Sequence, residues 1–373
     1  MSLQLVSQNM DFDENQGWFC DNIYNSLCTI NIKTNDILCV KPIPIDTGVD
    51  TYSGIKVYED KVILVPSKTN ILYVYDTTTG SFTDVKIDIE CMKGSKLYRL
   101  FSGIHVWNNQ IILTPARYPY LVFIDMDTYK VKYEKEWYID FEKKMGSRDN
   151  QYMLSLHKGE IQNNVLLLPL ISRTHKAVLE YNLKKRSHRI VTIEDSVGGI
   201  VDLIYAENKI YMCTHPDKEI LECDLNGRIL KTHIISDRNC SGILKLIDSH
   251  LDDHILIVDE DGGTIVQYNL KKNTFSELFR VEEIKSNIKK YIFDNKKLVV
   301  LGTDSKNENW IYNKYSGEVV KYGMNGISFV PLVCYEIESV KNILSGPLKG
   351  FKYNKAVRES QFGGIEELIS YLG

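Results

Sequence analysis

The stretch YSGIKVYEDKVILVPSKTNILYVYDTTTGSFTDVKI, residues 52–87, decides the fold of this chain. It contains four short runs of apolar and β-branched residues, at 52–58, 61–66, 71–76 and 82–87. The residues between these runs are rich in Asp, Thr, Ser and Gly. Runs of this length and composition predict β-strands, and separators of this kind predict tight turns. Because tight hairpins connect antiparallel strands, the stretch predicts a four-stranded meander.

The same four-run unit recurs along the rest of the chain. FSGIHVW at 101–107 matches YSGIKVY at 52–58, and the later runs of that copy are at 110–115, 120–125 and 131–136. Second and third runs of further copies are at 164–169, 177–182, 209–213, 219–224, 254–258, 264–269, 297–301 and 309–313. A degenerate first copy has its runs at 17–20, 26–31 and 36–40. In total the chain holds seven copies.

Seven meanders in series predict a radial arrangement. A single meander exposes apolar side chains on both faces, and stacking meanders side by side around an axis buries both faces. A repeat of about 40 to 50 residues is typical of such blades. We therefore expect an all-β fold, a seven-bladed β-propeller of four-stranded antiparallel blades, as one domain over residues 1–338.

Two further predictions concern the C-terminal part of the chain. The run SFVPLVCYEI at 328–337 has no blade of its own, so we expect it to pair beside the N-terminal blade and remove two open sheet edges. Residues 339–373 form an extension with apolar residues at 365, 368, 369 and 372, the spacing of one helical face. This short helix either packs on the disc or docks a partner.

Composition narrows the classes of function. The chain has 373 residues, of which 43% are hydrophobic and 25% charged, which excludes disorder. A net charge of −4 argues against a nucleic-acid partner, because such proteins carry a basic excess. The N-terminus lacks the pattern of a secretory signal, and no apolar run is long enough for a membrane span. The eight cysteines form no Cys-x-x-Cys pair, so we expect reduced thiols and a cytoplasmic protein. We also expect a monomer.

The order of strands and turns in the repeat, with Asp or Asn at the end of the third strand, resembles that of the seven-bladed β-propellers of the kelch, quinoprotein and virginiamycin B lyase type. The resemblance covers nearly the whole chain. Residues 13–20 and 30–34 are similar to a repeat unit of the lyase group, although Asn35 stands where that unit has Gly. The Trp-Asp dipeptides of WD40 blades and the regular double glycines of kelch blades are missing. The resemblance implies the architecture and carries over no catalytic residue.

In a propeller, loops between second and third strands, and between one blade and the next, converge at one end of the central channel. This topology brings together five arginines that could bind an anionic ligand, Arg99, Arg117, Arg148, Arg173 and Arg238. The alternative is that they are solvated and pair with loop carboxylates, those of Asp149, Asp237 and Glu260.

Two residues on these loops are candidates for chemistry. His215 could act as a general base, with a neighbouring Tyr118 or Arg117 as the electrophile. His105 and His157 fall in first strands near the channel, where a histidine is either a hydrogen-bonded wall residue or a base or ligand. Known metal, phosphate-loop and serine-nucleophile motifs are missing from the sequence, so we expect no metal and no cofactor.

Two functions remain open. The first is a binding or assembly module with a protein partner, its site on the loop face at the channel. The second is a lyase or hydrolase that acts on an anionic small molecule, such as a sugar or cyclic peptide, at the channel mouth.

Overall fold

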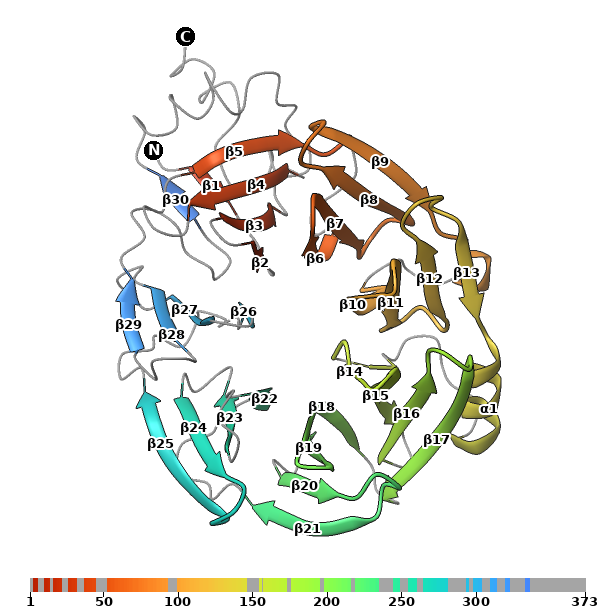
Figure 1. Ribbon diagram of the computed structural model, residues 1–373, viewed down its shortest axis with the longest axis vertical. Coiled ribbons are helices and arrows are strands. Elements are labelled where there is room, and N and C mark those ends of the chain that lie inside the picture. Colours follow the sequence, from red (N-terminus) through yellow and green to blue (C-terminus); the bar gives the residue numbers. More distant parts are fainter. Residues whose placement is uncertain are drawn as a thin grey trace. The chain divides into compact units, whose positions relative to one another are not determined.

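The computed structural model describes residues 3–5, 10–13, 16–21, 26–31, 37–44, 52–92, 99–145, 154–155, 157–172, 176–194, 198–215, 219–234, 244–248, 254–259, 264–280, 293–294, 298–303, 309–313, 319–322 and 333–335. Within these ranges the regular structure is almost entirely β-strand (Figure 1). The chain divides into two compact units. One is formed by residues 1–87 and 285–373, and the other by residues 88–284.

The first unit contains three four-stranded sheets and one strand pair among its described residues. Its first two sheets are β2 (Met10–Phe12), β3 (Gln16–Asp21), β4 (Ser26–Asn31) and β5 (Ile37–Pro42), then β6 (Tyr52–Tyr58), β7 (Lys61–Pro66), β8 (Ile71–Asp76) and β9 (Ser81–Lys86). Its third sheet is β26 (Phe293–Asp294), β27 (Leu298–Thr303), β28 (Asn309–Asn313) and β29 (Val319–Tyr322). The pair is β1 (Leu3–Leu5) with β30 (Val333–Tyr335).

The second unit contains two four-stranded sheets and one eight-stranded sheet among its described residues. The four-stranded sheets are β10 (Phe101–Trp107), β11 (Gln110–Pro115), β12 (Leu121–Asp125) and β13 (Val131–Glu134), and β22 (Leu244–Asp248), β23 (His254–Asp259), β24 (Thr264–Asn269) and β25 (Thr274–Arg280). The eight-stranded sheet is β14 (Glu160–Gln162), β15 (Val165–Ser172), β16 (Lys176–Asn182), β17 (Ser187–Glu194), β18 (Gly198–Ala206), β19 (Lys209–His215), β20 (Glu219–Cys223) and β21 (Ile229–Ile234). A short 3-10 turn, η1, spans Glu90–Met92.

Sequential antiparallel pairing confirms the predicted meanders. In each four-stranded sheet the strands pair in chain order, for example β6-β7-β8-β9 and β10-β11-β12-β13. The eight-stranded sheet consists of two such meanders, β14–β17 and β18–β21, joined where Ile171 and Ser172 of β15 pair with Gly199 and Gly198 of β18. We call the strands of each meander first to fourth in chain order.

A β-bulge recurs in the first strands. In β6 the register shifts between Tyr52 and Gly54, and in β10 it shifts between Phe101 and Gly103. A third first strand, β18, shifts at the equivalent place, between Ile200 and Asp202. The shared bulge explains why the sequences at 52–58 and 101–107 match, because both contain the same extra serine.

Two kinds of turn close the meanders, and both follow from residue type. Between first and second strands, the Asn108-Asn109 and Asn163-Asn164 pairs have positive φ at both positions, as a type I′ hairpin requires. Between third and fourth strands, the Asp that ends the third strand accepts backbone N–H groups of the turn. Asp125 Oδ1 accepts those of Asp127 and Thr128. The Asp or Asn seen at this place in the repeat is therefore a turn-forming residue.

The core of the second unit includes an α-helix that the sequence analysis did not predict. Residues 131–136 were expected to form one fourth strand, but β13 ends at Glu134 and helix α1 spans Glu136–Met145. Its Trp137, Phe141 and Met145 are buried with residues of β11, β12, β15 and β16. In Figure 1 the helix lies along the outer side of β17.

The segment 328–337 was expected to pair beside the N-terminal blade, and its strand β30 pairs with β1 instead. β30 forms an antiparallel ladder with β1, in which Gln4 is opposite Cys334. Among the described residues this ladder is a two-stranded sheet of its own and does not extend sheet β2–β5. The helix expected within residues 364–372 lies outside the described residues. No helix in the described ranges has the length and apolar character needed to cross a membrane.

Candidate functional site: the polar row along the first strands

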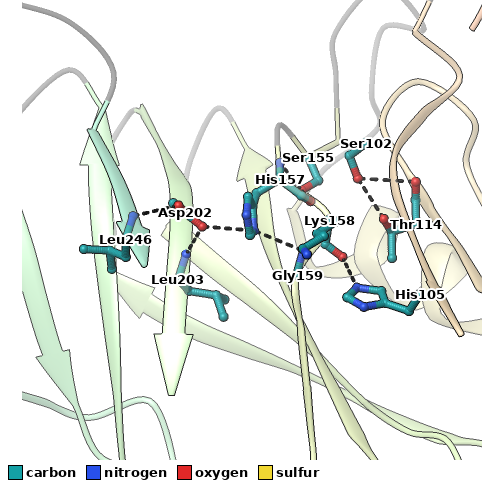
Figure 2. Close-up of polar contacts among 10 residues, drawn as sticks. All are labelled: Ser102, His105, Thr114, Ser155, His157, Lys158, Gly159, Asp202, Leu203 and Leu246. Carbon is teal, nitrogen blue, oxygen red and sulfur yellow. Dashed lines mark hydrogen bonds and ion pairs between the residues drawn. The ribbon is translucent and has the colours of Figure 1, made fainter. Parts of the chain in front are cut away.

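Asp202 is the centre of a row of polar contacts that links first strands in the second unit (Figure 2). It lies at the bulge of β18, and its side chain is only 1% exposed. Its carboxylate accepts the N–H of Leu203 at 2.8 Å and the N–H of Leu246, on the neighbouring first strand β22, at 2.9 Å. A buried carboxylate is stable only with such partners. Asp202 therefore ties β18 to β22.

His157 approaches the same carboxylate from the other side. Its Nδ1 atom lies 3.0 Å from Asp202 Oδ1 and 3.2 Å from the backbone nitrogen of Gly159. One nitrogen cannot serve both neighbours in the same way. When Nδ1 carries a proton it donates to Asp202, and when Nε2 carries the proton Nδ1 accepts from Gly159. Because the Asp202 carboxylate can only accept, the first tautomer satisfies it better.

An Asp–His pair can orient a histidine for general-base catalysis, but that chemistry also needs a nucleophile within reach. The hydroxyl of Ser155, two residues away, is fully buried. It donates to the backbone oxygen of His157 at 2.8 Å and accepts the N–H of His157 at 3.3 Å. Ser155 thus shapes the turn that carries His157. The arrangement supports a structural joint better than a catalytic dyad.

His157 does not lie in the element that the sequence predicted for it. It was expected within a first strand, but it precedes β14, which begins at Glu160. The turn that carries it includes Gly159, whose φ of +79° favours glycine and where a Cβ atom would lie 2.4 Å from the backbone oxygen of Leu167. The turn therefore brings His157 close to Asp202 by backbone geometry.

The row continues to β10 through His105. Its Nε2 atom lies 2.9 Å from the backbone oxygen of Lys158, so it holds the proton and donates. Beside it, a Cβ atom added to Gly103 would lie 2.2 Å from Cβ of Lys158, so only glycine fits at this contact. Ser102, the bulged residue, contacts Thr114 Oγ1 at 3.1 Å and donates toward the backbone oxygens of Thr114 and Pro115. Figure 2 shows these contacts on one side of the first strands.

The first unit contains a contact of the same design. Asp11 on β2 accepts the N–H of Val57 on β6 at 2.7 Å and pairs with Lys56 Nζ at 2.7 Å. Asp11 and Val57 are 46 positions apart, and Asp202 and Leu246 are 44 apart, which is the length of one repeat. In both units, a first-strand aspartate therefore holds the next first strand. We call each such contact a first-strand clasp.

Asp11 and Asp202 were not predicted from the sequence. The available signal was a charged residue inside an otherwise apolar strand, as in IVDLIY at 200–205. A charged residue in an apolar strand is buried only when it has polar partners. The spacing of one repeat length indicates that the next first strand supplies such a partner.

Among the predicted ligand-binding arginines, the structure brings two together. Arg99 is exposed, Arg117 is half-buried, and the N–H of Arg117 donates to the backbone oxygen of Arg99 at 3.2 Å. Both residues are at the end of sheet β10–β13 where β11 finishes. The other three, Arg148, Arg173 and Arg238, lie outside the described residues.

Tyr118 and His215, the predicted catalytic pair, belong to different meanders of the second unit. Tyr118 is 1% exposed, and its hydroxyl donates to the backbone oxygen of Asp88 at 2.7 Å. Burial, followed by the nearby Cys91, raises the pKa of Tyr118 above its usual value. His215 ends β19, and its backbone is opposite Gly199. Tyr118 follows the second strand β11, and His215 is the last residue of the second strand β19, so the two lie at equivalent strand ends of different meanders.

A second buried polar cluster lies between sheets β18–β21 and β22–β25. Glu222 on β20 accepts from Lys209 Nζ at 2.5 Å and from His233 Nε2 at 3.0 Å. The hydroxyl of Tyr268 lies 3.0 Å from the His233 ring nitrogens and donates to Asn273 Oδ1 at 3.0 Å. The contact between Tyr268 and His233 joins the two sheets, whereas the contacts of Glu222 with Lys209 and His233 lie within one sheet.

Burial and hydrogen bonding shift the pKa values of His233, Glu222 and Tyr268 in this cluster. Burial lowers the pKa of His233, and the hydrogen bond to Glu222 offsets only part of that shift. Burial raises the pKa of Glu222, but the hydrogen bonds from Lys209 and His233 outweigh it and hold the pKa below its usual value. Burial also raises the pKa of Tyr268 to about 12. The cluster is therefore most stable with a neutral His233 and an ionised Glu222.

Within the described ranges, no three His, Cys, Asp or Glu side chains are grouped closely enough to hold a metal ion.

The comparisons with known proteins concern the fold. No known family and no curated protein matches the sequence. Among solved structures, BamB from Moraxella catarrhalis is similar with a TM-score of 0.56 and 10% identity, over 83% of this chain and 85% of that chain. The WD40 repeats of RRP9 are similar with a TM-score of 0.53 and 8% identity, over 81% and 88%. U3-55K gives a TM-score of 0.54 and 8% identity, over 81% and 89%. These proteins are β-propellers, so the chain has a fold of the β-propeller type.

Proposed function

We propose that this protein is a seven-bladed β-propeller that serves as a binding and assembly module for a protein partner. The observation that carries the proposal is the use made of the polar residues along the first strands. His105, His157 and Asp202 lie on or beside the first strands, and each is engaged with a neighbouring strand or turn. These contacts hold the strands in fixed positions. A protein that presents binding loops needs such fixed strands.

Likeness in fold to WD40 proteins supports this class of function. One similar structure is that of the mitotic checkpoint complex, with a TM-score of 0.58 and 8% identity. By analogy, this chain would act through its strand-end loops rather than through chemistry. We place the binding site at the strand end that carries Arg99 and Arg117, with an acidic region of the partner as the counterpart. His215 would lie near this face, and Arg148, Arg173 and Arg238 would extend it.

The cytoplasm is the proposed location. Four cysteines of the described residues, Cys20, Cys28, Cys213 and Cys223, are buried in strands. Buried thiols of this kind act as small apolar side chains. Thiol titration of the denatured protein without reductant is expected to find all eight cysteines of the chain reduced. A native disulfide would argue for an oxidising compartment.

The experiment that tests the proposed function compares Arg99→Ala with Lys130→Ala. Both side chains are exposed, and Lys130 follows β12 at the opposite end of the same sheet. Partners are captured with the wild-type protein, identified, and their binding is then measured with each variant. Arg99→Ala is expected to weaken binding by about 1 to 3 kcal/mol, the range for a hydrogen bond to a charged group, and Lys130→Ala is expected to leave it unchanged. Equal binding by all three proteins would contradict the proposed site.

A further inference from the structure

Four tyrosines of the second unit form one cluster beside the end of β11. They are Tyr118 and Tyr120 in the segment between β11 and β12, Tyr133 on β13 and Tyr138 on α1. Tyr120 meets Tyr118 edge to face with ring centroids 5.7 Å apart, and it meets Tyr138 edge to face at 6.1 Å. The Tyr118 and Tyr133 centroids are 6.4 Å apart. We call this group the tyrosine cluster.

Backbone hydrogen bonds fix two of these rings. Tyr118 donates to the backbone oxygen of Asp88 at 2.7 Å, and the N–H of Asp88 donates to the Tyr133 hydroxyl at 2.7 Å. Tyr118 is buried, whereas Tyr120, Tyr133 and Tyr138 are half-buried. The cluster therefore presents preorganised ring surface to solvent.

The cluster already holds a cation from its own chain. The Lys135 ammonium lies 5.1 Å from the centroid of the Tyr120 ring and 6.0 Å from that of Tyr133. Both distances are within the range of a cation–π contact. Lys135 itself is exposed, so its ammonium can leave the rings for water without a large desolvation cost.

Two carboxylates belong to the surroundings of the Tyr120 ring. Asp88 is exposed and Glu142 is half-exposed. Burial, then Cys91, Glu142 and Asp88 raise the pKa of Tyr120. Aromatic faces with nearby carboxylates are complementary to an alkylammonium group.

We propose that the tyrosine cluster is a recognition site for a lysine side chain of a partner protein, with trimethyl-lysine as its best-fitting form. Lys135 occupies the Tyr120 and Tyr133 faces in the free protein and competes with that side chain. The inference rests on the proposed function as a protein-binding module and names one side chain that the module would recognise. It concerns a different surface chemistry from that of Arg99, so each can fail without the other.

The test uses N-acetyl-trimethyl-lysine amide as the probe and the full chain as the receptor. Binding is followed by tyrosine fluorescence and by calorimetry for the wild type, Lys135→Ala, and the control Lys132→Ala, which removes an exposed lysine of β13, the strand that ends just before Lys135. Lys135→Ala is expected to bind the probe about fivefold more tightly than the wild type, because the competing ammonium is gone. Lys132→Ala is expected to match the wild type.

A second variant shows where the probe binds. Adding Tyr120→Leu to Lys135→Ala is expected to weaken binding of the probe at least about fivefold, with a melting temperature that confirms folding. If Lys135→Ala and the wild type bind the probe equally, or if Tyr120→Leu leaves binding in the Lys135→Ala background unchanged, the proposal is wrong. This result does not depend on which partner the Arg99→Ala experiment identifies.

Discussion

The carboxylate of Asp202 accepts the backbone N–H of Leu246, 44 positions later, on the first strand of the next sheet. The side chain that makes this bond is almost fully buried and also faces His157. A single carboxylate thus serves three successive meanders of the second unit.

Asp202→Asn is expected to lower the free energy of unfolding by about 2 to 4 kcal/mol, because the amide replaces an acceptor oxygen with a donor at a site that offers donors. Urea denaturation measures the change. Asp84→Asn, on the exposed face of β9, serves as the control and is expected to change stability by less than about 0.5 kcal/mol. Equal losses of unfolding free energy in Asp202→Asn and Asp84→Asn would show that the first-strand clasp does not stabilise the protein.

Gly103 and Gly54 occupy equivalent places in the repeat and allow a matched comparison. A Cβ atom at Gly103 would lie 2.2 Å from Lys158 Cβ, whereas one at Gly54 would lie 3.3 Å from Val65. Gly103→Ala is expected to destabilise the protein by about 1 to 3 kcal/mol, and Gly54→Ala by clearly less. Thermal unfolding of both variants checks the order, and a reversed order would contradict the described contact between β10 and the turn before β14.

Stability is expected to fall as the pH drops below about 6.5, the usual value for histidine, because His233 has a lowered pKa in the folded protein. The unfolded chain takes up a proton first, and the folded protein follows only at lower pH. The groups around the ring are Glu222, Lys209, Lys231 and Tyr268, and of these only Glu222 favours protonation.

The variant His233→Gln is expected to reduce this loss of stability between pH 7 and pH 5, since glutamine can still donate to Glu222 but does not titrate in that range. Urea denaturation at several pH values measures the slope. His254→Gln, which removes a histidine outside this cluster, is the control and is expected to keep the wild-type slope. An unchanged slope in His233→Gln would show that another group dominates.

The ladder between β1 and β30 can be trapped chemically. Gln4 is opposite Cys334, so Gln4→Cys places two thiols at facing positions, where Cβ atoms are about 4.5 to 5.5 Å apart. Mild oxidation is expected to form a disulfide between them, detected as a linked peptide by mass spectrometry. Leu5→Cys, which is opposite Val333, is expected to give little of this link. No link from Gln4→Cys would contradict the register.

The sequence predicted the meanders well because each depends on local chemistry. Asn-Asn pairs at positive φ and the Asp that ends a third strand specify their turns without help from distant residues. Helix α1 was missed because the residues after Val131 read as a continuous strand. Trp137 and Phe141, four residues apart, carry the helical spacing, and their burial depends on β15 and β16.

The candidate site was less predictable because it depends on contacts between repeats. His157 reaches Asp202 through a turn that only the fold defines, and the two are 45 positions apart in the sequence. The arginines were chosen from loop positions alone, and the described contact between Arg99 and Arg117 joins backbone atoms. Side-chain convergence around a ligand depends on many loops at once, so no local pattern specifies it.

Helix α1 also affects how the protein behaves at high concentration. Lys144 Nζ donates to the backbone oxygen of Ile190 at 2.8 Å, so the helix satisfies part of the open edge of β17 while its Trp137 and Phe141 are buried. An open edge is a template on which a second chain can add a strand, which is one route to aggregation. At β17 that route first requires the helix to detach and expose two large aromatic rings to water. The helix therefore acts as a kinetic barrier to self-association at this edge.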